Sequence, residues 1–187
     1  MPTENVTPER IMQFAWGYIP PLVLEAAIRC RVFDTLDAGP KTIQEVHSAT
    51  GASERGLTAI MNALVGLNFL LKDDKERYSL APESAAFLVS TKASFQGGLI
   101  RHCSQHLIPK WLRLNEIVMT GKPVEAVNQE PTGSEFFQKF VSDLFPMNYA
   151  SAQTLAKHLA FGESGEPVHV LDLAAGSGVW GIARYSL

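Results

Sequence analysis

The sequence contains little cysteine, little net charge and no apolar run long enough to span a membrane. Its 16 Lys and Arg against 19 Asp and Glu give a formal net charge of -3, so no general basic field attracts nucleic-acid phosphates. Cys30 and Cys103 lack CxxC spacing, which favours reduced thiols over a disulfide framework. No basic-then-apolar leader and no run of about 18 apolar residues are present. We therefore expect a soluble, cytoplasmic protein with no membrane and no nucleic-acid partner.

The first 40 residues are predicted to form two apolar helices. Thr7, Pro8 and Glu9 are typical of a helix start, and Pro20 and Pro21 are expected to end that helix. Its apolar residues are too many for one stripe, so we expect burial on more than one side: Ile11, Met12, Phe14, Ala15, Trp16 and Ile19. A second apolar helix is predicted from about Leu22.

Two capped helices and a hairpin are predicted next. Thr42 with Glu45 forms a capping box, and the helix that it opens should end at Gly51. Ser53 is the predicted cap of a helix that runs to about Phe69. Residues 70–80 then alternate between apolar, charged and apolar segments, as in two strands joined by a turn. Helix, helix and hairpin in this order are typical of a winged helix.

The middle of the chain is predicted to be helical with interruptions. One or two helices should cover 95–120 and end at Gly121, and a loop follows. A second capping box is predicted at 132–135. Pro146 is expected to interrupt the helix after that box, before another helix at 150–159.

A glycine-rich turn near residue 176 is the candidate ligand-binding site of the chain. Residues 168–173 are short, apolar and β-branched, which predicts a buried parallel strand. Gly176 and Gly178 follow, and a helical pattern begins at about Val179. Glycines let a backbone turn sharply close to a ligand, and the start of the next helix favours a negatively charged group. Taken as GxGxxG, the turn would be a weak dinucleotide signal.

The residues around this turn distinguish the alternatives. Asp172, Ala174, Gly176 and Gly178 resemble the first motif of class I methyltransferases, which implies S-adenosylmethionine as cofactor. In that family the loop wraps the amino-acid part of the cofactor, and the acid lies close to its ammonium group. Ala174 stands where the family often has glycine, and its Cβ favours a conventional φ.

Residues upstream of the motif narrow the resemblance to one family. The capped helices, the charged hairpin and the segment from Trp111 to Gly121 resemble the winged-helix dimerisation domain and connecting helices of O-methyltransferases of the caffeic-acid and hydroxyindole type. This resemblance implies a homodimer formed through N-terminal helices and methyl transfer to a hydroxyl of a small molecule. The family's histidine base lies in its C-terminal half, so we assign no catalytic residue in these 187 residues. We expect this chain to be an N-terminal fragment that is inactive alone.

The predicted fold is mostly α, and three parts are expected. Residues 1–95 form a winged-helix dimerisation domain, and 96–165 form a helical connector. Residues 166–187 are the first strand, turn and helix of an α/β Rossmann-like cofactor domain. Because one strand cannot satisfy its own backbone hydrogen bonds, the last part should be incomplete as a fold.

Several side chains have two interpretations. His102 and His106 flank Cys103, but no third ligand at a zinc-site spacing is evident, so we expect packing or pocket-lining histidines and no metal. Residues 147–149 (Met147, Asn148 and Tyr149) are candidate substrate contacts, and a core role is equally consistent with them.

Two other functions remain alternatives. The winged-helix order is compatible with a DNA-binding regulator, but the helix from Ser53 carries Arg55 as its only basic residue, beside Glu54. The chain could also act alone as a dimerisation or interaction module.

Overall fold

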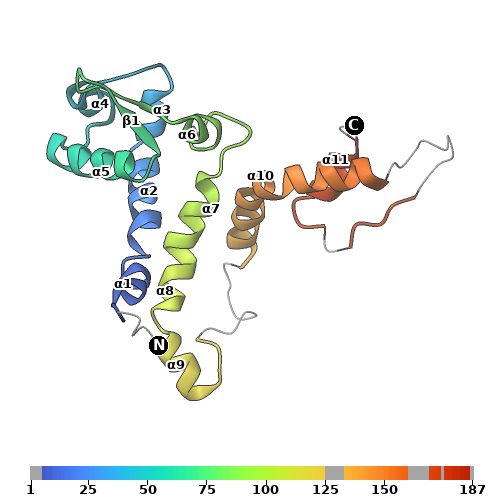
Figure 1. The fold of residues 1–187 in the computed structure, drawn as a ribbon. Coiled ribbons are helices and arrows are strands. Elements are labelled where there is room, and N and C mark those ends of the chain that lie inside the picture. Colours follow the sequence, from blue (N-terminus) through green and yellow to red (C-terminus); the bar gives the residue numbers. More distant parts are fainter. Residues whose placement is uncertain (1–5, 125–132, 160–168, 174, 186–187) are drawn as a thin grey trace, which may run out of the picture. The chain divides into compact units, whose positions relative to one another are not determined.

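The computed structural model describes residues 6–124, 133–159, 169–173 and 175–185. The chain divides into two compact units, Met1–Ser90 and Thr91–Leu187. Figure 1 shows that both are built mainly from helices, and the only sheet among the described residues is a two-stranded hairpin in the first unit. The expected boundary at residue 165 lies outside the described residues.

The first unit packs its helices around one apolar core. Its elements are α1 (Glu9–Ala15), α2 (Ile19–Arg29), α3 (Val32–Leu36), α4 (Ile43–Thr50), α5 (Glu54–Gly66), β1 (Leu70–Lys72), β2 (Tyr78–Leu80) and α6 (Pro82–Phe87). The most deeply buried apolar side chains come from α2 to β2: Ala27, Val32, Phe33, Leu36, Val46, Leu57, Met61, Leu64, Leu70 and Tyr78. The core therefore lies between α2 and the hairpin.

The N-terminal helix α1 lies outside this core. It begins after Pro8 without a side-chain cap and has no buried residue. Ile11 and Phe14 are 73% and 74% exposed, so the prediction of burial on more than one side is wrong for the single chain. Pro20 and Pro21 occupy the first turn of α2, where a missing N–H breaks no helical bond. They begin the second helix instead of ending the first.

The segment Glu9–Arg29 corrects one further expectation. Within the described residues it is long and apolar enough, by length and composition alone, to cross a membrane. Soluble helices pass the same test, so this finding is weak evidence for a membrane span. The prediction that no segment would qualify is nevertheless wrong by this measure.

The caps predicted at Thr42 and Ser53 are present, whereas Thr7 does not cap α1. Glu45 N donates to Thr42 Oγ1 at 3.3 Å, and Thr42 N donates to Glu45 Oε2 at 2.7 Å, which completes the capping box. Gly51 ends α4 with φ +73°. Gly56 N donates to Ser53 Oγ at 3.2 Å and caps α5. These local bonds explain why two short helices begin where the sequence predicts.

The predicted hairpin is also confirmed. Strands β1 and β2 are antiparallel, with Leu70 opposite Leu80 and Lys72 opposite Tyr78. Tyr78 also bridges to Lys41, and its hydroxyl donates to Asn62 Oδ1 on α5 at 2.7 Å. The hairpin is thereby fixed to the helix that precedes it, as in a winged helix.

The second unit begins with a nearly continuous helical segment. Its elements are α7 (Gly97–His102), the π-helix η1 (Cys103–Leu107), α8 (Ile108–Trp111), α9 (Leu114–Thr120), α10 (Gly133–Leu159) and α11 (Val179–Tyr185). Gly121 ends α9 with φ +64°, as predicted. The second predicted capping box lies partly outside the described residues.

Helix α10 runs through Pro146 without a break. The predicted interruption there, and the separate helix at 150–159, are therefore wrong. Proline removes one backbone hydrogen bond and crowds the preceding turn. Phe145 and Tyr149, on either side of Pro146, pack against a buried cluster of α10 and α11 formed by Ala152, Val179 and Ala183, which offsets this cost.

The predicted strand at 168–173 is not formed. Residues 169–172 are extended chain without a strand partner among the described residues, and residue 168 is outside them. A parallel strand needs a neighbour to bond its backbone. The sequence pattern of a buried strand is therefore present, while the ladder that would define it is absent from the described residues.

Candidate cofactor-binding site

The glycine turn has the backbone shape that its sequence predicts. Gly176 and Gly178 have φ +57° and +67°, in a backbone region that residues with a Cβ rarely adopt. Gly178 N donates to the carbonyl of Ala175 at 2.8 Å, and Ile182 N donates to the carbonyl of Gly178 at 2.8 Å. The turn thus closes on itself and leads directly into α11. Ala174 lies outside the described residues, so its predicted conformation stays a prediction.

Asp172 lies beside the start of this helix. Its Oδ2 is shielded from solvent and has no hydrogen-bond partner among the described residues. A Cβ added at Gly181 would lie 3.9 Å from that oxygen, an ordinary contact distance. An unpaired, shielded carboxylate oxygen is unfavourable unless it meets a donor or a positive charge. The site therefore fits an ammonium group.

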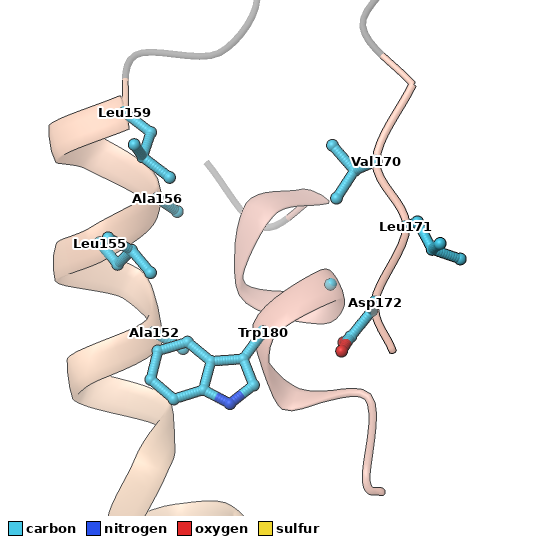
Figure 2. A pocket seen from close by; sticks show the side chains of 9 residues that line it. Ala152, Leu155, Ala156, Leu159, Val170, Leu171, Asp172 and Trp180 are labelled. Carbon is cyan, nitrogen blue, oxygen red and sulfur yellow. The ribbon is translucent and has the colours of Figure 1, made fainter. Parts of the chain in front are cut away.

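A pocket of about 180 Å³ opens next to Asp172. Figure 2 shows side chains of α10, the segment before the glycine turn and α11 around it, with the Trp180 ring beside Ala152 of α10 and the Asp172 carboxylate facing α11. The lining is almost entirely apolar: Ala152, Leu155, Ala156, Leu159, Val170, Leu171, Trp180 and Gly181, with Asp172. Pockets that enclose a small molecule measure about 300–1,000 Å³. This one is too small to be a complete cofactor site.

Packing between α10 and α11 holds the turn in place. Ala152, Val179 and Ala183 are buried together, and Phe145 and Tyr149 pack against them. The rings of Phe145 and Tyr149 are stacked with their centroids 5.4 Å apart. The helix that follows the glycine turn is therefore anchored by small side chains that allow a close approach.

The candidate substrate residues 147–149 do not share one face. Met147 is 43% exposed, whereas Tyr149 packs against the α10–α11 cluster. Consecutive helical residues point about 100° apart, so the three cannot line one surface together. Their role as substrate contacts stays a prediction, and Tyr149 has a packing role already.

The histidines near residue 104 lie at the end of α7 and in η1. His102 is buried against Phe140 of α10, with ring centroids 4.6 Å apart, and the His106 ring lies 5.2 Å from it. No group of three His, Cys, Asp or Glu side chains suited to a metal occurs in the described part of the chain.

Sequence reasoning missed Trp180, Leu155 and Leu159 as lining residues of the pocket. Leu155 and Leu159 were recognised only as a helical pattern, and Trp180 lies two residues after a turn glycine. Nothing local indicates that α10 folds back onto the turn. Such a long-range contact depends on tertiary packing alone.

The fold and the turn together define a class of protein. A winged-helix unit, connecting helices and an acid before a left-handed glycine turn resemble the N-terminal elements of class I methyltransferases with a dimerisation domain. Residues 12–90 match the family model described as the O-methyltransferase dimerisation domain. This part of the chain is similar to that family, in agreement with the resemblance inferred from the sequence.

Curated relatives agree with this assignment. The chain is 28% identical over 130 residues to the tetracenomycin polyketide synthesis 8-O-methyl transferase TcmO of Streptomyces glaucescens, covering 70% of this chain and 37% of that protein. It is 29% identical over 134 residues to the N,N-dimethyltransferase OxyT of Streptomyces rimosus, covering 71% and 38%. The chain thus spans well under two thirds of the length of these relatives.

Solved structures share the fold. The structure of a protein described as a putative O-methyltransferase from Nostoc punctiforme matches with a TM-score of 0.80 and 25% identity, over 96% of this chain and 53% of that chain. Human N-acetylserotonin methyltransferase in complex with S-adenosylmethionine matches with a TM-score of 0.78 and 22% identity, over 100% and 58%. The mostly helical fold with the start of a Rossmann-like domain is therefore confirmed.

Proposed function

We propose that this chain provides the dimerisation domain and one wall of the cofactor site of an S-adenosylmethionine-dependent methyltransferase. The observation that carries this proposal is the pairing of an O-methyltransferase dimerisation domain at 12–90 with the turn from Asp172 to Gly178. The relatives named above are methyltransferases, and one solved relative holds S-adenosylmethionine.

The glycines and the acid of the turn are proposed to contact different groups of the cofactor. Gly176 and Gly178 let the backbone approach the amino-acid part closely, and Asp172 offers the ammonium group its Oδ2, which has no hydrogen-bond partner within the described part of the chain. S-adenosylmethionine, when bound, supplies a methyl group on a sulfonium centre that a nucleophilic acceptor takes up. The turn would bind and orient S-adenosylmethionine. The described residues offer no complete pocket for this cofactor or for the methyl acceptor.

A small-molecule hydroxyl is the acceptor that we favour. The matched domain is that of O-methyltransferases, and TcmO is named as an O-methyl transferase. An amine acceptor is the second candidate, because OxyT is named as an N,N-dimethyltransferase. Parallel assays with matched phenol and aniline acceptors distinguish the two.

The 187-residue chain alone is proposed to be inactive. Its pocket is smaller than a cofactor site, and residues 169–172 lack a strand partner within the described part of the chain. Calorimetric titration of this chain with S-adenosylmethionine is expected to give no micromolar binding. Micromolar binding would show that these residues already form the site.

The role of Asp172 is tested in the protein expressed from its whole reading frame. The change Asp172→Asn keeps the shape but removes the charge that pairs with the ammonium group, so affinity for S-adenosylmethionine should fall at least about tenfold. Asp74→Asn, in the exposed hairpin turn, is the matched control and should leave affinity unchanged. Equal affinity in Asp172→Asn and the unchanged protein would contradict the proposed site.

Self-association through α1 and α2 is part of the proposal. Large apolar side chains on these helices and on the turn between them are exposed in the single chain: Ile11, Met12, Phe14, Trp16, Tyr18, Ile19 and Leu22. An apolar surface of this kind is typical of a protein or membrane interface, and the dimerisation-domain match begins at residue 12. We therefore favour a second copy of the chain as the partner.

The compartment is proposed to be the cytoplasm. Both Cys30 and Cys103 are free thiols, which is the usual state in a reducing environment. Binding to lipid vesicles by the purified dimer would argue against this proposal, because Glu9–Arg29 would then act as a membrane segment.

A further inference from the structure

Two helices of the second unit meet along a line that we call the α7–α10 seam, formed by Gly98, His102, Phe140 and Asp143. The ring centroids of His102 and Phe140 are 4.6 Å apart. A Cβ added at Gly98 would lie 2.6 Å from Asp143 Oδ1, so this carboxylate sits directly on the backbone of α7. Gly98 contacts Asp143, and His102, four residues later in α7, contacts Phe140, three residues earlier in α10. The two helices are therefore antiparallel here.

His102 is the buried titratable group of the seam. Its side chain is only 8% exposed, although imidazole carries a proton near neutral pH when it is free in water. Three charged or titratable groups face it: His106 of η1, Lys110 of α8 and Asp143 of α10. Burial lowers the pKa of His102 most, His106 and Lys110 lower it further, and Asp143 opposes them.

The chain after His102 is a widened helical turn. Ile108 N donates to the carbonyl of Cys103, five residues back, in η1. Pro109 accounts for this turn, because it has no N–H and its ring crowds the carbonyl four residues earlier. The widened turn places the His106 ring 5.2 Å from His102. Single π-turns of this kind often occur at functional sites.

We propose that the α7–α10 seam is a proton-sensitive latch: neutral His102 holds α7 against α10, and protonated His102 releases it. A charged His102 ring in this position loses most of its hydration. It also faces His106 and Lys110, which disfavour a positive charge there. Asp143 supplies one opposing charge, already seated on α7. This device is separate from methyl transfer and from the cofactor turn.

The direction of the pH effect follows from the lowered pKa. The folded seam binds fewer protons than the open one, so its stability is complete above the ordinary histidine value of about 6.5. That stability is lost as the pH falls through the pKa of His102 in the folded state. Acid therefore opens the seam, and neutral or higher pH closes it.

Hydrogen exchange of the full chain measures the opening. Protection of the amides at 97–107, corrected for the intrinsic rate at each pH, is expected to fall severalfold between about pH 7.5 and about pH 5.5. In His102→Gln, which cannot titrate, this fall should disappear. His158→Gln, on the exposed face of α10, is the matched control and should behave as the unchanged protein.

Two neighbouring variants shift the transition in opposite directions. His106→Gln removes a repelling neighbour, so the closed seam tolerates protonated His102 better and should stay closed to a lower pH. Asp143→Asn removes the attracting one, so the seam should open at a higher pH. These shifts remain informative if His102→Gln fails to fold. Constant protection across the pH range, the same fall in a folded His102→Gln, or shifts of the wrong sign would each overturn the latch.

Discussion

At the scale of single residues, backbone conformation was the most predictable property. Gly51, Gly121, Gly176 and Gly178 all adopt positive φ, and each was identified from sequence as a helix end or a turn. The reason is local, because a residue without a Cβ is the usual solution wherever the chain must turn to the left. Side-chain burial was less predictable, since it depends on partners far along the chain.

The turn glycine Gly178 provides a direct test at this scale. Gly178→Ala should lower the free energy of unfolding of the second unit by about 1–2 kcal/mol, the cost of a Cβ in the left-handed region. The nearest side-chain atom, Ile182 Cδ1, would lie 3.7 Å from the new Cβ, so strain and not a clash causes the loss. Urea unfolding measures it.

Gly66→Ala is the matched control. Gly66 lies in α5 with no atom near a new Cβ, so alanine there should be neutral or stabilising by up to about 1 kcal/mol. Equal effects of the two substitutions would show that the positive φ of Gly178 is not strained for alanine.

At the scale of elements, capped helices and the hairpin followed the sequence, whereas prolines did not. Pro20 and Pro21 begin α2, and Pro146 lies inside α10. A proline disfavours a helix locally, but packing on both sides of it decides whether the helix continues. Local rules therefore located side-chain caps and glycine helix ends better than they predicted the effect of a proline.

A substitution at Pro146 measures how much this proline destabilises α10. Pro146→Ala restores a backbone N–H in the helix interior, so the free energy of unfolding should rise by about 1–3 kcal/mol. Thermal unfolding followed by circular dichroism measures the change. Pro82→Ala, in the first turn of α6 where no bond is lost, should change it by less than about 1 kcal/mol. A destabilised Pro146→Ala would show that α10 needs the proline.

At the scale of the whole molecule, exposed apolar helices point to a partner. Phe14→Glu places a charge on the surface of α1, where the phenylalanine is 74% exposed. The dimer should dissociate at least about tenfold more readily, equivalent to about 1.4 kcal/mol. Sedimentation equilibrium over a range of concentrations measures the dissociation constant.

The control for this test is another exposed apolar residue. Leu71→Glu, on β1 and 53% exposed, should leave the dimer intact. A chain that is monomeric at every concentration, or equal dissociation of both variants, would argue that α1 and α2 bind something other than a second copy.

The sequence by itself determined the helices capped by Thr42 and Ser53, the hairpin, the glycine turn and, through its resemblance, the family. These features depend on neighbours within a few residues, where backbone conformation and capping bonds are decided. Only the tertiary structure decided which apolar faces are buried. It showed that α1 is exposed, that α10 continues through Pro146, that the segment before Asp172 lacks a strand partner in the described residues, and that His102 is buried against Phe140. Burial and strand pairing join residues distant in the chain, and no local pattern specifies them.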